Sequence, residues 1–237
     1  MNAAGRVGGI QVRGNRRHGV LEEQMTSSHS ALKPNSYDYK GRFASYWRQI
    51  SEVEMLTSGR RPHLEVGPGT GFLTERLRER GHEIQTLDID EASCPDIKAS
   101  VLSIPVEDNY FDTVSAFEVL EHLPFDSFRP ALFELSRVSQ SGVVISVPDV
   151  RYCLDVSVAI LSNAQEFGRV FSFPRIFNRK LPPYTPGGHY WEIGRPGYPL
   201  RQLLKAIPEQ LHLIRDYRVP GNSIHHFFVM KPRGNKG

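Results

Sequence analysis

The chain has 237 residues, of which 39 % are hydrophobic, 23 % charged and 10 % aromatic. These fractions are typical of a globular protein and exclude a mostly disordered or collagen-like chain. The formal charge of +3 comes from 29 basic and 26 acidic residues, and part of the excess lies in the first 30 residues. The remaining sequence therefore carries no clear nucleic-acid footprint.

The cysteines and the lengths of the apolar runs indicate the compartment. Cys94 and Cys153 lie in unrelated contexts, which fits a reducing compartment, although two thiols could still form one bridge. No run approaches the roughly 18–20 apolar residues of a membrane span, and the basic N-terminus lacks the apolar segment of a secretory signal. We therefore expect a cytoplasmic protein with no membrane span.

The first part of the chain differs in composition from the rest. It is rich in Gly, Arg, Ser and Asn without a sustained apolar period, so we predict a disordered N-terminal tail over residues 1–34. A translation start at Met25 is the alternative explanation. Residues 35–237 are expected to form a single domain, because no linker-like segment divides them.

The predicted fold begins with an amphipathic helix or helix pair over residues 37–56, where apolar residues recur at helical spacing. These residues are Phe43, Trp47, Ile50, Val53 and Leu56. The chain then alternates, with strands predicted over residues 63–66, 83–87, 111–117 and 142–147, and helices over residues 72–80, followed by a C-cap glycine at Gly81, and 128–138. This alternation is typical of an α/β fold with a doubly wound, mostly parallel sheet.

The C-terminal third has a different pattern. A helix is predicted over residues 199–207, followed by strands over residues 211–219 and 224–231. The segment Pro220-Gly221-Asn222-Ser223 between the two strands has the composition of a turn. The two strands are therefore expected to form an antiparallel hairpin.

The strongest chemical signal is the segment Gly67-Pro68-Gly69-Thr70-Gly71, between a predicted strand and a predicted helix. Glycines let the backbone approach a ligand closely, and a helix N-terminus offers unpaired N–H groups. A dinucleotide-binding loop has the spacing G-x-G-x-x-G and binds a pyrophosphate. Here the third glycine comes one residue earlier, and Glu65 would repel a pyrophosphate but suits a ligand with an ammonium group. A tight turn without a ligand is the structural alternative.

Asp88 ends the next predicted strand, on the side of the sheet where the glycine loop lies. A carboxylate there can accept hydrogen bonds from both hydroxyls of a ribose, and Ile89 beside it offers an apolar face to a purine. Asp90 competes for the ribose role, and a cap or a surface acid is the plainer explanation. We favour Asp88.

Four motifs, taken together, resemble those of class I S-adenosylmethionine (SAM)-dependent methyltransferases. They are Glu65-Val66-Gly67-Pro68-Gly69-Thr70-Gly71, Asp88, Leu102-Ser103-Ile104-Pro105-Val106-Glu107-Asp108-Asn109-Tyr110-Phe111-Asp112 and Phe117-Glu118-Val119-Leu120-Glu121-His122-Leu123. The resemblance covers residues 60–150 in order, and its nearest branch contains ubiquinone-biosynthesis and many bacterial small-molecule enzymes. It implies a seven-stranded sheet ending in an antiparallel hairpin, and SAM as the cofactor.

The resemblance also implies how the cofactor is held. The loop residues Gly67, Pro68, Gly69 and Gly71 would contact the methionine part of SAM, Glu65 would lie near its ammonium group, Asp88 and Ile89 would meet the ribose and the purine, and Glu118 would lie beside the methionine part. Ser100 and Val101 stand where the family meets adenine. Ser100 departs from the commoner Asp, which leaves a backbone contact from Val101.

A hydroxyl acceptor must also lose its proton, and a histidine suits that task near neutral pH. His122 follows the fourth predicted strand, whose end faces the crevice, and is the first candidate catalytic residue. His189, in a Gly/Pro/aromatic loop typical of a substrate lid, is the second. His225 and His226 are adjacent on the last strand, so only one of them is expected to point inward. A hydrogen-bonded structural role is the alternative for each histidine.

Glu118, Glu121 and His122 raise the alternative of a metal site. On the first turn of a helix these positions share a face, so two carboxylates and an imidazole could converge on a divalent cation. Some relatives with this E-x-x-E-H pattern hold a metal there, and many do not. We predict no metal, with these three residues as the alternative.

Residues 150–197 lie outside the resemblance and are predicted to be a substrate-lid insertion. Basic and aromatic residues interleave at the odd positions Phe167, Arg169, Phe171, Phe173, Arg175, Phe177 and Arg179. Such a pattern can bind single-stranded nucleic acid, a lipid surface, or a phosphorylated or sugar substrate. We favour a lid whose Phe side chains pack inward and whose Arg side chains are solvated, followed by an anionic glycan- or nucleotide-linked substrate.

The sequence therefore predicts a single-domain SAM-dependent methyltransferase that acts on a small molecule, at a hydroxyl. One alternative is a SAM-binding partner protein without catalysis. The other is an NAD(P)-dependent oxidoreductase, which the glycine spacing and Glu65 disfavour.

Overall fold

The computed structural model describes residues 40–160, 165–173 and 188–233. The predicted tail over residues 1–34 lies outside the described residues. In chain order the elements are α3 (Lys40–Leu56), β1 (His63–Val66), α4 (Phe72–Glu79), β2 (Ile84–Asp88), η1 (Glu91–Ser93), β3 (Ile97–Lys98), β4 (Phe111–Phe117), η2 (Leu120–His122), η3 (Phe125–Ser127), α5 (Phe128–Val138), β5 (Ser139–Pro148), β6 (Tyr152–Ile160), β7 (Gln165–Phe173), α6 (Leu200–Ala206), β8 (Leu211–Val219) and β9 (Asn222–Pro232).

Seven of the strands form one sheet in the order β3-β2-β1-β4-β5-β9-β8. The first five strands in this order are parallel, and β9 pairs antiparallel with both β5 and β8. This arrangement confirms the predicted α/β fold class, including the C-terminal hairpin. The carboxyl ends of β1, β2, β4 and β5 therefore meet at one edge of the sheet, where ligands bind in doubly wound folds.

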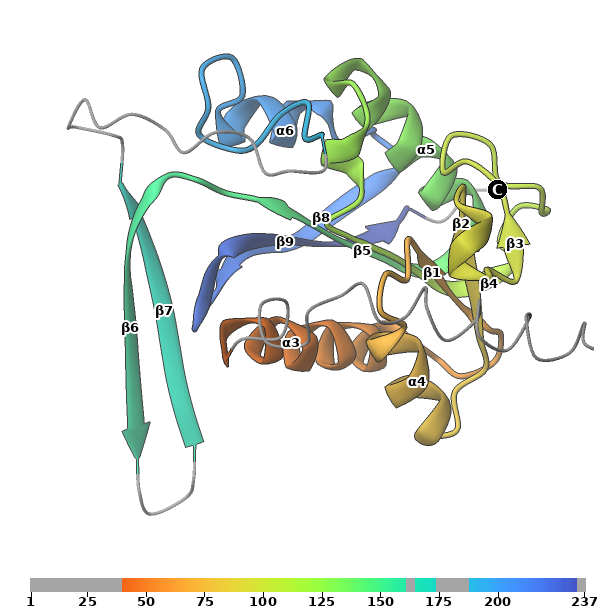
Figure 1. The fold of residues 1–237 in the computed structure, drawn as a ribbon, viewed down its shortest axis with the longest axis horizontal. Coiled ribbons are helices and arrows are strands. Elements are labelled where there is room, and N and C mark those ends of the chain that lie inside the picture. Colours follow the sequence, from red (N-terminus) through yellow and green to blue (C-terminus); the bar gives the residue numbers. More distant parts are fainter. Residues whose placement is uncertain (1–39, 161–164, 174–187, 234–237) are drawn as a thin grey trace, which may run out of the picture. The chain divides into compact units, whose positions relative to one another are not determined.

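Helices cover both faces of the sheet (Figure 1), with α3 and α4 on one face and α5 and α6 on the other. Helix α5 buries Phe128, Leu132 and Leu135, which lie on one side of the helix because they are three or four residues apart. On the opposite face, Val53 of α3 packs with Leu77 of α4. The central strands β1 and β4 are buried along almost their whole length because both faces of the sheet are covered.

The end of α4 shows the glycine C-cap that the sequence predicts. Gly81 has a φ of +86°, and its N–H donates to the carbonyl of Arg78 while the N–H of His82 donates to that of Leu77. These two bonds form a Schellman motif, which requires the left-handed conformation that glycine adopts without strain. The motif turns the chain sharply into β2.

Helix α3 differs from the prediction in which of its residues are buried. Ile50 and Val53 lie in the core, but Phe43 and Trp47 are 51 % and 58 % exposed. Tyr46 is buried instead and stacks on Phe72, the first residue of α4, at 4.2 Å between ring centroids. Helical spacing predicts which residues share one face of a helix. It does not show which part of that face other elements of the fold cover.

The insertion after β5 also differs from the prediction. Strands β6 and β7 form a separate two-stranded antiparallel sheet, so the alternation noted in the sequence reflects a strand over Gln165–Phe173. Phe171 and Phe173 share a face with Arg169 and are 47 % and 45 % exposed. The prediction that these phenylalanines pack inward is therefore wrong. Arg175, Phe177 and Arg179 lie outside the described residues.

His225 and His226 were expected to differ in burial, but both are buried. Their side chains leave β9 on opposite faces, and β9 lies inside the sheet between β5 and β8. Both faces are covered at this position, so the expectation that only one histidine points inward is wrong.

Two further observations concern the predicted compartment. Cys94 and Cys153 are both free thiols. Among the described helices, none combines the length and apolar character needed to cross a membrane.

Asp112 of β4 ties the segment after α3 to the sheet. It is fully buried, and its carboxylate accepts hydrogen bonds from Thr57, Ser58, Gly59 and Ser141. Burial alone would raise the pKa of Asp112, but the hydrogen bonds from Ser141, Thr57 and Ser58 outweigh it and hold the pKa below its usual range. The ionised carboxylate therefore stabilises the fold above the ordinary Asp pKa, and this contribution is lost as the pH falls through the lowered value.

Replacing Asp112 by Asn should reduce the free energy of unfolding at pH 7 by about 2–4 kcal/mol, because several charge-assisted hydrogen bonds are lost. Urea unfolding followed by circular dichroism measures this, and the difference from wild type should shrink towards pH 3. Asp108→Asn is the control: Asp108 is an exposed partner of Arg137, and its loss should cost less than about 1 kcal/mol. Equal losses in the two variants would contradict the assignment.

Candidate functional site

The glycine loop begins directly after β1. Gly67, Gly69 and Gly71 all have positive φ, between +54° and +74°, a region that favours glycine. A Cβ atom at Gly69 or Gly71 would meet no heavy atom within 4 Å. A Cβ at Gly67 would lie 2.6 Å from Cγ2 of Val119. The outer part of the loop therefore borders open space, which fits a cofactor, while its first glycine packs against the segment after β4.

Glu65 lies within β1 and is 5 % exposed. Its carboxyl oxygen accepts a hydrogen bond from the Thr74 hydroxyl on α4. Burial raises the pKa of Glu65 to about 7, and the bonds from Thr74 oppose this only in part. A cationic group next to Glu65 would favour its ionised form, which fits the expected ammonium group.

Asp88 and Asp90 have different surroundings, which bears on the choice between them. Asp90 caps η1, because its side chain accepts from the backbone N–H of Ala92 at 2.9 Å. One oxygen of Asp88, Oδ1, accepts from the N–H of Asp90 at 2.9 Å. Asp88 ends β2 at the edge where the glycine loop lies, and Ile89 beside it is 73 % exposed. Asp90 thus acts as the cap of η1, and Asp88 stands at the edge of the sheet next to the glycine loop.

Ser100 and Val101 follow the short strand β3, which pairs with β2 at Asp88. The side chain of Val101 is buried in the core, and Ser100 is half-buried. The Ser100 hydroxyl accepts from the backbone N–H of Leu102 at 3.2 Å. The Val101 side chain therefore points away from the crevice, and any contact with an adenine there would come from its backbone.

Glu118 comes directly after β4 and has a φ of +56°. Such a conformation is strained in a non-glycine residue and is often found at functional sites. Its carboxylate accepts from the Ser146 hydroxyl at 2.7 Å and lies 3.8 Å from Nε2 of His225. Glu118 is thus held between the ends of β4, β5 and β9.

The strained backbone at Glu118 changes the set of residues that could bind a metal. Glu121 and His122 lie on the 3-10 turn η2, and Glu118 precedes this turn instead of sharing a helical face with them. The structure places His189 beside them instead, and the ligand atoms of Glu121, His122 and His189 lie within 4.8 Å of one another. The sequence predicts that no metal is bound, with Glu118, Glu121 and His122 as the alternative. The structure groups His189, not Glu118, with Glu121 and His122.

Glu121 has an uncommon environment for a carboxyl group. Its side chain is fully buried, and within the described part of the chain neither oxygen forms a hydrogen bond. Burial, together with the nearby carboxylates of Glu118 and Glu192, holds the pKa of Glu121 well above its usual range. Nε2 of His189 lies 3.9 Å from Oε1 of Glu121.

The ring of His189 is oriented by a hydrogen bond to Glu192. Nδ1 lies 2.9 Å from Oε1 of Glu192, whose other oxygen accepts from the buried Arg195. A carboxylate can only accept, so Nδ1 carries the proton and Nε2 has a free lone pair. This nitrogen faces Glu121, and the His122 ring lies edge-on to that of His189 at 4.8 Å.

The segment around His189 is bound to the same edge of the sheet. Tyr190 donates its backbone N–H to the carbonyl of Glu121 at 2.8 Å, and the indole N–H of Trp191 donates to that of Leu123 at 3.0 Å. Ile193 bonds to the carbonyl of Pro148 at the end of β5. The two histidine candidates, 67 positions apart in the sequence, are thereby brought together.

Sequence reasoning missed the residues that orient the candidates. Ser146 and His225 hold Glu118, while Glu192 and Arg195 hold His189. The spacing of His189, Glu192 and Arg195, three residues apart, was a readable signal. The contacts of Ser146 and His225 with Glu118 had no such signal in the sequence, because they depend on the pairing of β5 with β4 and β9.

Comparison with known proteins agrees with this geometry. Residues 64–147 match the family model described as a methyltransferase domain. Among curated protein sequences, none matches this chain.

Solved structures of low identity share the fold. The CcbJ methyltransferase of Streptomyces caelestis is 15 % identical over 85 % of this chain and 100 % of that chain, with a TM-score of 0.53. An S-adenosylmethionine-dependent methyltransferase of Clostridium acetobutylicum is 11 % identical over 90 % and 100 %, with a TM-score of 0.51. The magnesium protoporphyrin IX methyltransferase of Synechocystis, with bound SAM, is 12 % identical over 94 % and 100 %, with a TM-score of 0.51.

The matched stretch runs from β1 to the end of β5 and includes the glycine loop, Asp88 and Glu118. The sheet order brings these residues to one edge, and the solved structures support the fold alone. Residues 64–147 thus match a methyltransferase domain, and the chain shares its fold with these solved structures.

Proposed function

We propose that the protein transfers the methyl group of SAM to a hydroxyl of a small molecule, with His189 as the base. The observation that carries this proposal is the orientation of His189 by Glu192, which leaves Nε2 free at the carboxyl end of β4. A base held by a third group in this way is a common arrangement in group transfer. His122 was the first candidate from sequence; we now assign it a supporting position beside the acceptor, because it is exposed.

The reaction needs positioning and the removal of one proton. When bound, SAM supplies a methyl group on a positively charged sulfur, so the acceptor oxygen gains a C–O bond as the S–C bond breaks. His189 Nε2 takes the hydroxyl proton. Glu192 stabilises the positive charge that then develops on the ring. Glu121, whose pKa is raised well above its usual range by burial and the neighbouring carboxylates, lies beside Nε2 of His189.

We further propose that the glycine loop and Glu65 hold the methionine part of SAM, and that Glu118 contacts the end of this part nearest the acceptor. Asp88 is proposed to bind the ribose. Ile89 and the backbone of Ser100 and Val101 are proposed to contact the purine. The acceptor is proposed to be anionic, because the insertion over residues 150–197 presents arginines beside exposed aromatic side chains. This insertion is proposed to act as the substrate lid of a single catalytic domain. The branch with the ubiquinone-biosynthesis enzymes stays a prediction.

Asp88→Ala should weaken SAM binding by about tenfold or more, because the ribose loses charge-assisted hydrogen bonds. Isothermal titration calorimetry measures this affinity. Asp90→Ala is the matched control, because it removes the η1 cap and should leave the affinity for SAM intact. Unchanged affinity in the Asp88 variant would remove the ribose assignment, and NADH binding in place of SAM would favour the oxidoreductase alternative.

His189→Asn should lower methyl transfer by about 100-fold or more, as for loss of a general base, with SAM affinity unchanged. The assay follows a radiolabelled methyl group from SAM into an extract, and fractionating the labelled product identifies the acceptor. His212→Asn, in an exposed position on β8, should retain full activity. Wild-type protein that binds SAM but labels nothing would indicate a non-catalytic SAM-binding partner, and full activity in the His189 variant would exclude it as the base.

A divalent cation is a second role for the residues around His189. The buried Glu121 carboxyl without a hydrogen bond in the described region, beside two imidazoles, is a donor set that suits zinc or manganese. We expect the enzyme to keep its activity after treatment with a chelator, as a histidine base requires. If the activity is instead lost and restored by a metal, and Glu121→Gln abolishes stoichiometric metal in elemental analysis, the cation replaces the base.

A further inference from the structure

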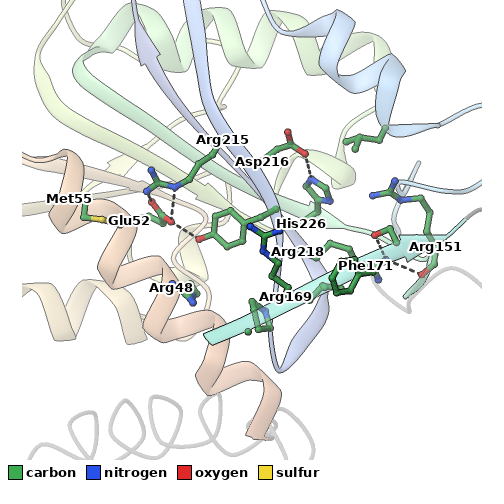
Figure 2. Close-up of a pocket in the computed structure, with 16 residues that line it drawn as sticks. Arg48, Glu52, Met55, Arg151, Arg169, Phe171, Arg215, Asp216, Arg218 and His226 are labelled. Atoms are coloured by element: carbon green, nitrogen blue, oxygen red, sulfur yellow. Dashed lines mark hydrogen bonds and ion pairs between the residues drawn. The ribbon is translucent and has the colours of Figure 1, made fainter. Parts of the chain in front are cut away.

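A cavity of about 840 Å³ lies between α3, the edge strand β8, the end of β9 and strand β7. Figure 2 shows its side chains converging from these elements. None of the candidate cofactor-binding or catalytic residues described above lines it. Its volume falls within the roughly 300–1,000 Å³ range of small-molecule sites.

Arginines dominate the charge of this cavity. The lining contains five of them: Arg48, Arg151, Arg169, Arg215 and Arg218. The acids among the lining residues are Glu52 and Asp216, so five positive charges face two negative ones. The lining thus carries an excess of three positive charges, counting histidine as neutral.

Three of the five arginines have acidic partners. Arg215 pairs with Glu52, which also accepts from the Tyr217 hydroxyl at 2.6 Å. Arg151 and Arg218 both pair with Asp149, which lies behind the lining.

Asp149 remains ionised at neutral pH. Burial opposes its charge, but hydrogen bonds from His226 and Arg151 and the charges of Arg218 and Arg151 lower the pKa of Asp149 to about 2. Counting this one carboxylate reduces the excess around the cavity to two positive charges.

Arg48 and Arg169 account for this remaining excess. Neither forms an ion pair or hydrogen bond within the described ranges 40–160, 165–173 and 188–233. Arg48 comes from α3 and Arg169 from β7, and both border the same cavity (Figure 2). These two guanidinium groups come from separate elements, and neither is paired with a carboxylate of the described structure. They therefore attract an anion that can bind both of them.

The cavity also offers aromatic surface next to these charges. Phe171 is two residues from Arg169 on the same face of β7, lines the cavity and is 47 % exposed. Tyr217 lines it from β8. Burial and the nearby Glu52 hold the pKa of Tyr217 well above its usual range, so its phenol adds no negative charge.

We propose that this cavity binds a phosphate-bearing small molecule, whose phosphate groups contact Arg48 and Arg169 and whose body packs on Phe171. The proposal does not depend on methyl transfer, because the cavity and the candidate cofactor site share no lining residue. It applies whether the phosphate belongs to the methyl acceptor or to a separate ligand.

The test is calorimetric titration of the full-length protein with inorganic pyrophosphate, ADP and adenosine. Pyrophosphate and ADP should bind saturably, ADP more tightly, and adenosine should not bind. The double variant Arg48→Gln, Arg169→Gln should bind ADP at least about tenfold more weakly, because charge-assisted hydrogen bonds are lost. This variant loses no ion pair of the described structure, so its fold should be retained, which an unchanged melting temperature verifies.

Arg129→Gln is the matched control, because Arg129 is exposed on α5 and does not line the cavity. An equal loss of ADP binding in this control would overturn the proposal, since the binding would then reflect overall charge. Absence of saturable pyrophosphate and ADP binding would also overturn the proposal. A further titration with an oligothymidylate serves as a probe for single-stranded nucleic acid. Binding of this probe without binding of pyrophosphate or ADP would likewise overturn the proposal. SAM affinity measured in the same samples separates these failures from a failure of the methyltransferase assignment.

Discussion

The parallel pairing of β2, β1, β4 and β5 is the constraint on which the site depends. Each of these strands ends at the same edge of the sheet, and candidate site residues lie at or just after the ends of β1, β2 and β4. The glycine loop, Asp88 and Glu118 are separated in sequence by up to 51 positions, from Gly67 to Glu118. Without this strand order, they would not face one crevice.

Buried carboxyl groups near this edge differ in charge according to their partners. Glu65 has one hydroxyl partner and a pKa of about 7, whereas Asp149 is bonded to His226 and Arg151 and has a pKa of about 2. The pKa of Glu121 is raised well above its usual range by burial and by the nearby carboxylates of Glu118 and Glu192. The pKa of the same chemical group is therefore shifted in opposite directions within one region of the fold.

Where local pattern and packing agree, the sequence was sufficient to predict the elements. The structure reproduces the predicted bounds of β1, α5 and β8 to the residue, because each has an apolar pattern bounded by turns or polar residues. Strand β3 has two residues, which is too short for any periodicity. The β6–β7 pair was missed because it forms a sheet of its own, apart from the main sheet. The alternating Phe and Arg residues in β7 do not show which face of such a strand is covered.

The site divides in the same way. The glycine loop, Asp88 and Glu118 were readable because each follows a predictable strand. The left-handed backbone of Glu118 was not readable, since glutamate has no preference for it, and neither was the position of His189 beside Glu121. Contacts such as His189 with Glu121 depend on chain segments that only the folded sheet brings together.

The close approach of Gly67 to Val119 links two segments that the sequence presents as separate motifs. A methyl group at position 67 would occupy the place of the Val119 side chain, and Val119 lies between Glu118 and the turn with Glu121. Evolution cannot easily alter the first loop without also remodelling the second. Because Gly67 also has a positive φ, a smaller residue at position 119 would not by itself make room for a side chain at position 67, and the two motifs constrain each other.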